Sequence, residues 1–154
     1  KIIAVDVEDE KLTLAKDLGA DFTMNPTRDD VKKEVFALSE NRGADVVFEV
    51  VGINDTVKTA VAVARKGATI TLVGNLSPSV ELPLQAIVTQ QIRLQGSCAI
   101  CGEYPAVLDM IDRKAINVDA ILSAEAPLSE GAAWFRRLYD KEAGLIKVVL
   151  KPGE

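Results

Sequence analysis

The chain has 154 residues, of which 48% are hydrophobic, and its formal net charge is -5. This length and apolar content suffice for the core of an ordinary domain without metal ions or disulfide bonds. Acidic and basic residues are interspersed, which disfavours nucleic acid and anionic membranes as partners. No apolar run approaches the roughly 20 residues that span a membrane, and no secretory signal is found. We therefore expect no membrane segment and a cytoplasmic location.

The sequence contains no histidine and a single CxxC pair, Cys98 and Cys101. Two cysteines alone do not complete a four-ligand zinc site, and without histidine no Ser-His or Cys-His nucleophile exists. A redox or metal role for the pair stays open, but we favour small buried side chains just past a strand end. Any chemistry must therefore come from a cofactor or from residues outside this chain.

Short β-branched runs alternate with helical patterns over the first hundred residues, as in the crossover units of a parallel sheet. Several runs are continuously apolar, which is typical of strands covered by helices on both faces. Gly19, Gly43 and Gly67 are predicted to end helices or form turns. In chain order we predict a strand at 1–7, a helix at 8–18, strand 20–24, helix 29–41, strand 44–51, helix 54–64, strand 68–73 and strand 91–97.

We predict one more helix at 102–113, and the rhythm changes after about residue 115. From there we predict a strand, a helix and a strand at 120–126, 128–139 and 145–150. The last helix is expected to bury Trp134, Phe135 and Tyr139 in its apolar stripe. The predicted fold class is thus α/β: an incomplete doubly wound parallel sheet over 1–100, followed by a separate strand-helix-strand piece within 101–154.

Asp6 stands at the end of the first predicted strand. In a Rossmann-type unit an acidic residue there accepts hydrogen bonds from the adenosine ribose and repels a 2′-phosphate, which favours NAD over NADP. The alternative is that Asp6 and Asp9 only cap the next helix. The GxGxxG motif expected about 20 residues earlier is not in this chain. Asp6 would then end the second strand of the fold, and the sheet would lack a central strand.

Four segments resemble zinc-dependent medium-chain dehydrogenases of the alcohol and sorbitol dehydrogenase family. In order, they are IIAVDVEDEKLTLAKDLGAD, Asn25-Pro26, GADVVFEVVG and RKGATITLVGN. The resemblance implies that 1–100 are part of an NAD-binding Rossmann domain and 101–154 a connecting helix with a C-terminal segment of the catalytic domain. It implies hydride transfer between an alcohol or polyol and the nicotinamide. It also implies a zinc ion in the parent enzyme, with ligands outside this chain.

The resemblance assigns cofactor contacts at strand ends and on the last strand. Tight turns at the glycines and a solvated edge charge at the lysine are the structural alternatives. The residues so assigned are Asp6 and Lys11 for the adenosine ribose, Val51 and Gly52 for the cleft, Val73, Gly74 and Asn75 for the nicotinamide and its ribose, and Lys147 for the pyrophosphate.

The strand at 91–97 resembles the last cofactor-domain strand of the family, which in many members pairs with its twin, so a homodimer is expected through it. We expect the chain alone to be inactive and to bind NAD weakly, because the helix terminus that grips the pyrophosphate is not in it. A response-regulator receiver is an alternative, although it requires an aspartate where the strand ADVVFEV ends with Glu49. A noncatalytic dehydrogenase-like binding protein is a third possibility.

Overall fold

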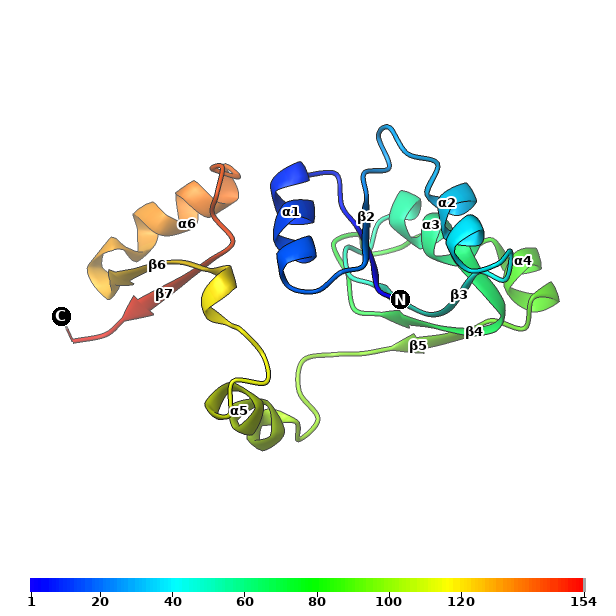
Figure 1. Ribbon diagram of the computed structural model, residues 1–154. Coiled ribbons are helices and arrows are strands. Elements are labelled where there is room, and N and C mark those ends of the chain that lie inside the picture. Colours follow the sequence, from blue (N-terminus) through cyan, green and yellow to red (C-terminus); the bar gives the residue numbers. More distant parts are fainter. Residues whose placement is uncertain (154) are drawn as a thin grey trace. The chain divides into compact units, whose positions relative to one another are not determined.

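A computed structural model describes residues 1–153 (Figure 1). The chain divides into two compact units, Lys1–Cys101 and the residues from Gly102 onward. Every strand pairing in the described residues is parallel, and helices connect the paired strands. The predicted α/β class is therefore confirmed. No helix within residues 1–153 has both the length and the apolar character needed to cross a membrane.

The first unit contains two parallel sheets, one of strands β1 and β2 and one in the order β3-β4-β5. In the larger sheet β4 is central, so that Thr69 lies opposite Val46 of β3 and Arg93 of β5. The elements are β1 (Ile3–Val5), α1 (Asp9–Asp17), β2 (Phe22–Met24), α2 (Val31–Leu38), β3 (Ala44–Glu49), α3 (Asn54–Val63), β4 (Ala64–Leu72), α4 (Leu84–Thr89) and β5 (Arg93–Gly96).

The alternation of β4 builds the core of the larger sheet. Ala68 and Ile70 are buried and pack with Val61 of α3 and Ile92 before β5. Ile70 is completely buried. Because side chains alternate along a strand, these residues share one face of β4, and the helix covers it.

Helix α2 joins the two sheets through a second cluster. Its buried Val31 and Val35 pack with Met24 of β2 and Val63 of α3, and Ile3 of β1 and Val47 of β3 pack against the same cluster. Burial of this apolar surface, rather than hydrogen bonding between β1 and β3, therefore holds the sheets in one unit.

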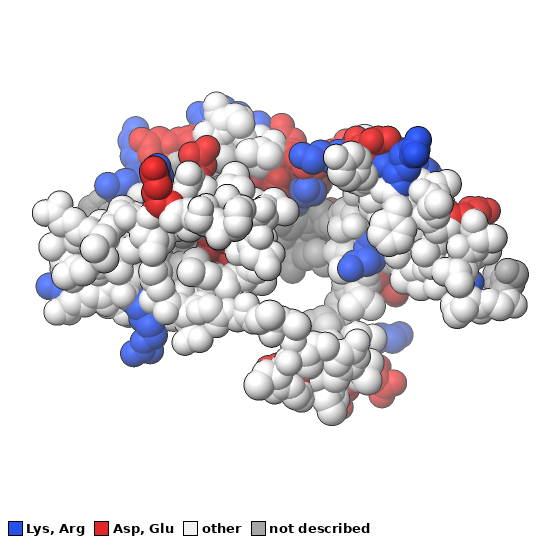
Figure 2. Space-filling view, turned by 180° about the vertical axis from the view of Figure 1, so that it is seen from behind, with Lys and Arg blue, Asp and Glu red and all other residues white. Residues whose placement is uncertain are grey.

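One edge of β1 and one edge of β3 are among the strand edges without a partner in the described residues. β1 pairs only with β2, and β3 pairs only with β4. Along β3, Val46 and Phe48 are 55% and 68% exposed, whereas Val47 between them packs in the core. One face of β3 is thus apolar and uncovered. Figure 2 shows a broad surface of the first unit with few charged side chains.

The helices and strands are shorter than predicted at several ends, and two features differ more. The strand predicted at 68–73 already begins at Ala64; it contains Gly67 with a φ of +74°, and its register with β3 shifts between Ala44 and Val46. Helix α4 was not predicted: its six residues are too few to show a repeating apolar stripe, although Ala86 and Ile87 pack against the core.

The second unit contains one parallel pair, β6 (Leu122–Pro127) and β7 (Lys147–Lys151), connected by α6 (Gly131–Tyr139). Helix α5 (Tyr104–Asp112) precedes them, and short 3-10 helices cover Asp119–Ile121 and Leu128–Glu130. The predicted strand-helix-strand order is confirmed.

The predicted burial of the α6 aromatic residues is wrong. Phe135 and Tyr139 are 72% and 87% exposed, and Trp134 is half-buried with the Arg137 guanidinium 3.9 Å from its ring centroid. The helix approaches β7 at its first residue, where a Cβ on Gly131 would lie 3.1 Å from Leu150. A two-stranded sheet offers too little surface to cover the rest of the helix stripe.

Candidate functional site

Asp6 directly follows β1 and is half-buried. Its backbone N–H donates to the Met24 carbonyl at 3.2 Å, which extends the pairing with β2. Its carboxylate accepts the Glu8 N–H at 2.9 Å. Asp6 is therefore held at the end of the strand by Met24 of β2 and by the Glu8 N–H. Its side chain does not cap α1, whose N-cap is Glu8 with no side-chain hydrogen bond.

Lys11 lies in the first turn of α1 and reaches back to Glu8 in the same loop. Its ammonium donates to Glu8 Oε1 at 2.9 Å. That hydrogen bond, together with the negative charges of Asp6 and Glu8, raises the pKa of Lys11 above its ordinary value. The Asp6 carboxylate and the Lys11 ammonium thus lie near the same strand end, that of β1.

The ends of β3 and β4 meet backbone to backbone. The Glu49 carbonyl accepts N–H groups from Val73 at 2.8 Å and Gly74 at 3.1 Å, and the pairing continues to the Val51 and Gly52 carbonyls. A Cβ on Gly74 would lie 2.2 Å from backbone atoms of Val51. Gly52 has a φ of +82°, and a Cβ there would lie 2.4 Å from Asn75 N. Only glycine fits either place.

Five of the eight residues assigned from the sequence therefore lie together at these two strand ends. In open α/β sheets the ends of parallel strands are where ligands bind, because backbone groups there are turned toward a crevice. The residues are Val51, Gly52, Val73, Gly74 and Asn75.

Glu49 organises this turn, and it was not assigned to the site from the sequence. The residue is 4% exposed, and its Oε1 accepts the Val51 N–H at 3.0 Å and the Gly52 N–H at 2.8 Å. Burial raises the pKa of Glu49, but the hydrogen bonds from Gly52, Thr56 and Val51 outweigh it and bring the pKa below the ordinary value. Its Oε2 is buried without a hydrogen-bond partner. The signal in the sequence was a single charge in the apolar run VVFEVV.

The geometry of Glu49 also bears on the receiver alternative. A receiver needs an accessible aspartate at the end of this strand for phosphorylation, whereas Glu49 is buried and turned onto the following backbone. The receiver interpretation has no support here.

A polar network joins the loops after β1 and β2. Asn25 is 3% exposed, and its amide donates to the Val7 carbonyl and to Asp9 Oδ1, both at 3.0 Å. Arg28 donates to both Asp9 oxygens at 3.0 and 2.7 Å. The Arg28 and Asn25 hydrogen bonds lower the pKa of the Asp9 carboxyl.

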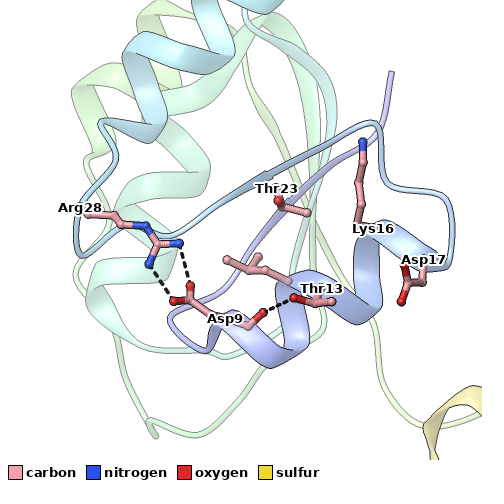
Figure 3. Close-up of a pocket in the computed structure, with 7 residues that line it drawn as sticks. Asp9, Thr13, Lys16, Asp17, Thr23 and Arg28 are labelled. Atoms are coloured by element: carbon pink, nitrogen blue, oxygen red, sulfur yellow. Dashed lines mark hydrogen bonds and ion pairs between the residues drawn. The ribbon is translucent and has the colours of Figure 1, made fainter.

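Asp9 and Arg28 face each other beside a hollow of about 280 Å³ along α1, as Figure 3 shows. None of the eight assigned residues lines this hollow. Its lining residues are Asp9, Leu12, Thr13, Lys16, Asp17, Thr23 and Arg28.

Three further expectations from the sequence concern residues away from the ends of β3 and β4: the lysine assigned to the pyrophosphate, the two cysteines and any metal ligands. Lys147 is exposed at the start of β7, in the second unit. Cys98 and Cys101 are exposed, so the expectation that they are buried is wrong: the chain has already left β5 at Gly96. Among residues 1–153, no group of three or more His, Cys, Asp or Glu side chains is placed to hold a metal ion.

A parallel α/β sheet with glycine turns at its strand ends defines a Rossmann-like fold. The family model of zinc-binding dehydrogenases matches residues 1–113, and the chain belongs to this family. Mouse sorbitol dehydrogenase is 27% identical, over 98% of this chain and 42% of its own length. The chain therefore spans less than half of the length of such relatives, and it corresponds to their C-terminal part.

Solved structures agree with this assignment. L-idonate 5-dehydrogenase from Escherichia coli is 31% identical with a TM-score of 0.85, over 97% of this chain and 42% of that one. A zinc-binding dehydrogenase from Sinorhizobium meliloti bound to NADP is 26% identical with a TM-score of 0.85, over 99% of this chain and 45% of that one. The homologues are alcohol and polyol dehydrogenases, so the family is one of oxidoreductases.

Proposed function

We propose that this chain is the cofactor-holding part of an NAD-dependent alcohol or polyol dehydrogenase. The observation that carries the proposal is Asp6, which is held at a strand end by the Glu8 N–H with Lys11 beside the same loop. Such a carboxylate accepts two ribose hydroxyls, whereas a 2′-phosphate would meet its negative charge. This favours NAD, although one structural neighbour carries NADP.

The nicotinamide half of the cofactor is assigned to the ends of β3 and β4. Gly52 and Gly74 leave no side chain there, so a flat ligand can approach the backbone. Val73 is 48% exposed and offers an apolar side chain to the ring, with its carbonyl for the carboxamide. These residues would orient the ring while NAD supplies the hydride chemistry when bound.

Zinc does not fit the residues of this chain. The sequence contains no histidine, and the described residues hold no cluster of ligands. We infer that a zinc ion, where the whole enzyme has one, is held by other parts of it. The chain alone is accordingly proposed to be inactive towards alcohols and polyols.

We further propose that residues 1–100 belong to the cofactor domain and 101–154 to the catalytic domain, with Lys147 directed at the pyrophosphate in the whole enzyme. In the whole enzyme we propose one further strand that hydrogen-bonds to the unpaired edges of β1 and β3. A glycine-rich turn after such a strand would grip the pyrophosphate. Without it, NAD binding is expected to be weak. A homodimer through the strand at 91–97 is part of the same proposal.

The test is a calorimetric titration of the chain with NAD⁺ and NADP⁺. We expect dissociation constants weaker than micromolar, with NAD⁺ bound more tightly than NADP⁺, and we expect Asp6→Asn to abolish that preference. Glu10→Gln is the matched control, because it removes the same charge from exposed α1. A micromolar dissociation constant for NAD⁺ would overturn the claim that the pyrophosphate is bound by groups outside this chain. An NAD⁺ preference that persists in Asp6→Asn would overturn the role of Asp6.

A noncatalytic binding protein remains the second candidate from the sequence. It predicts that the whole protein binds NAD but turns over no alcohol or polyol, whereas our proposal predicts turnover with the cofactor reduced.

A further inference from the structure

The Asp9–Arg28 pair lies beside the strand end that carries Asp6. Asp6 donates its N–H to the Met24 carbonyl, and Asn25, the next residue, donates to both the Val7 carbonyl and Asp9. These hydrogen bonds join the loops after β1 and β2. Asp9 is the first residue of α1 after the first loop, and Arg28 lies in the second loop. Through Asn25 the pair is connected to the loop that directly follows Asp6.

Lys11 and Arg28 are both cations of this region, but Lys11 offers a single ammonium that already donates to Glu8, whereas Arg28 carries a planar guanidinium. A guanidinium binds carboxylates and phosphates with the same two-pronged geometry, and an arginine near the ribose is how such folds accept a 2′-phosphate. In this chain both of these donor nitrogens are already occupied, because they donate to the two Asp9 oxygens at 3.0 and 2.7 Å. Figure 3 shows the two side chains facing each other.

Asp9 is also held in place independently of Arg28. The buried Asn25 amide donates to Asp9 Oδ1, so the carboxylate is fixed even when the arginine moves. A 2′-phosphate would have to displace a carboxylate that is already anchored. The pair is exposed, and such pairs contribute little to folding, so its removal leaves the fold intact.

We propose that Asp9 is a specificity-determining residue for the cofactor: it occupies Arg28 and so withholds from a 2′-phosphate the guanidinium that would bind it. The inference rests on the proposed function and adds a second discriminator to Asp6. Asp6 repels the extra phosphate by its charge, and Asp9 occupies the arginine of the neighbouring loop. Loss of Asp6 alone is then insufficient to produce a preference for the phosphorylated ribose.

The test uses the full chain, labelled with ¹⁵N and titrated with 5′-AMP and with adenosine 2′,5′-bisphosphate. The variants are Asp6→Asn, Asp6→Asn/Asp9→Asn, and the latter with Arg28→Gln. We expect the second substitution to raise the affinity for the bisphosphate relative to 5′-AMP by about tenfold, as a charged two-pronged contact does. Arg28→Gln should remove the gain, and Arg28→Lys should leave only part of it.

The matched control frees another arginine from the same kind of pair. Glu142 accepts from Arg137 at 2.7 and 2.6 Å in the second unit, so Asp6→Asn/Glu142→Gln changes the charge equally. This variant should show no gain. The inference would be overturned if Asp9→Asn left the ratio of the affinities for the bisphosphate and 5′-AMP unchanged, or if the gain survived Arg28→Gln. The proposed function would still stand in that case, provided that 5′-AMP binds near Asp6. Absence of 5′-AMP binding in every variant would overturn both.

Discussion

Glu49 gives the sharpest test of how the strand-end turn is held. Its carboxylate accepts two backbone N–H groups, and the residue is 4% exposed. Hydrogen bonds to a charged group contribute about 1.5 kcal/mol each at the low end of their range, and neutral ones about half as much. We therefore expect Glu49→Ala to lower the free energy of unfolding by about 3 kcal/mol and Glu49→Gln, which keeps an acceptor, by about 1.5 kcal/mol.

The pH dependence of the same residue follows from the direction of its pKa shift. The folded-state pKa of Glu49 lies below the ordinary value of 4.5. The carboxylate thus stabilises the fold above the unfolded-state pKa, and this contribution is lost as the pH falls through the folded-state pKa. The difference in unfolding free energy between the wild type and Glu49→Gln should accordingly shrink from pH 7 to pH 3.

Urea unfolding followed by circular dichroism measures these quantities, and amide exchange at Val51 and Gly52 reports on the turn itself. Glu10→Gln is the control, since Glu10 is exposed on α1, and it should change the unfolding free energy by less than about 0.5 kcal/mol. A Glu49→Gln difference that is equally large at pH 7 and pH 3 would show that the stabilisation does not come from the charge of Glu49.

Three further substitutions test the packing around the site. Gly74→Ala should cost about 3 kcal/mol of unfolding free energy by urea titration, whereas Gly96→Ala, which meets no atom within 4 Å, should cost little; equal effects would contradict the close approach of the two turns. Asn25→Ala should lower the free energy of unfolding by about 2 kcal/mol and at least double the rate of amide exchange in the loops after β1 and β2. An unchanged free energy of unfolding would show that these hydrogen bonds do not stabilise the fold. Phe48 is 68% exposed, so Phe48→Glu should change the free energy of unfolding by less than about 0.5 kcal/mol in urea titration, and a large loss would contradict the exposure of this face of β3.

The order of elements was predictable because local patterns determine it. The alternation of buried runs with helical segments fixed the parallel α/β class, and the glycines at Gly52 and Gly74 marked the strand ends. The close approach of these two turns depends on register between β3 and β4, which no local pattern specifies. The role of Glu49 was missed for the same reason, since its partners are visible only once the turn is formed.

Burial was predicted less well where a pattern had no surface to pack against. Phe135 and Tyr139 fit an apolar stripe, but the two-stranded sheet of the second unit does not cover them. The cysteines were expected to pack as small apolar side chains, yet they follow a strand of only four residues and are exposed. Amphipathic spacing predicts which side chains share a face, and the amount of neighbouring structure decides whether that face is buried.

Residue-resolved titration of the ¹⁵N-labelled chain with NAD⁺ tests the cofactor assignment most directly. The account predicts that amide shifts cluster after β1, at Asp6 and Lys11, and at the turns Val51-Gly52 and Val73-Gly74. Shifts confined to the side of α1 that carries Thr13 and Lys16, or spread over the surface without a cluster, would contradict it.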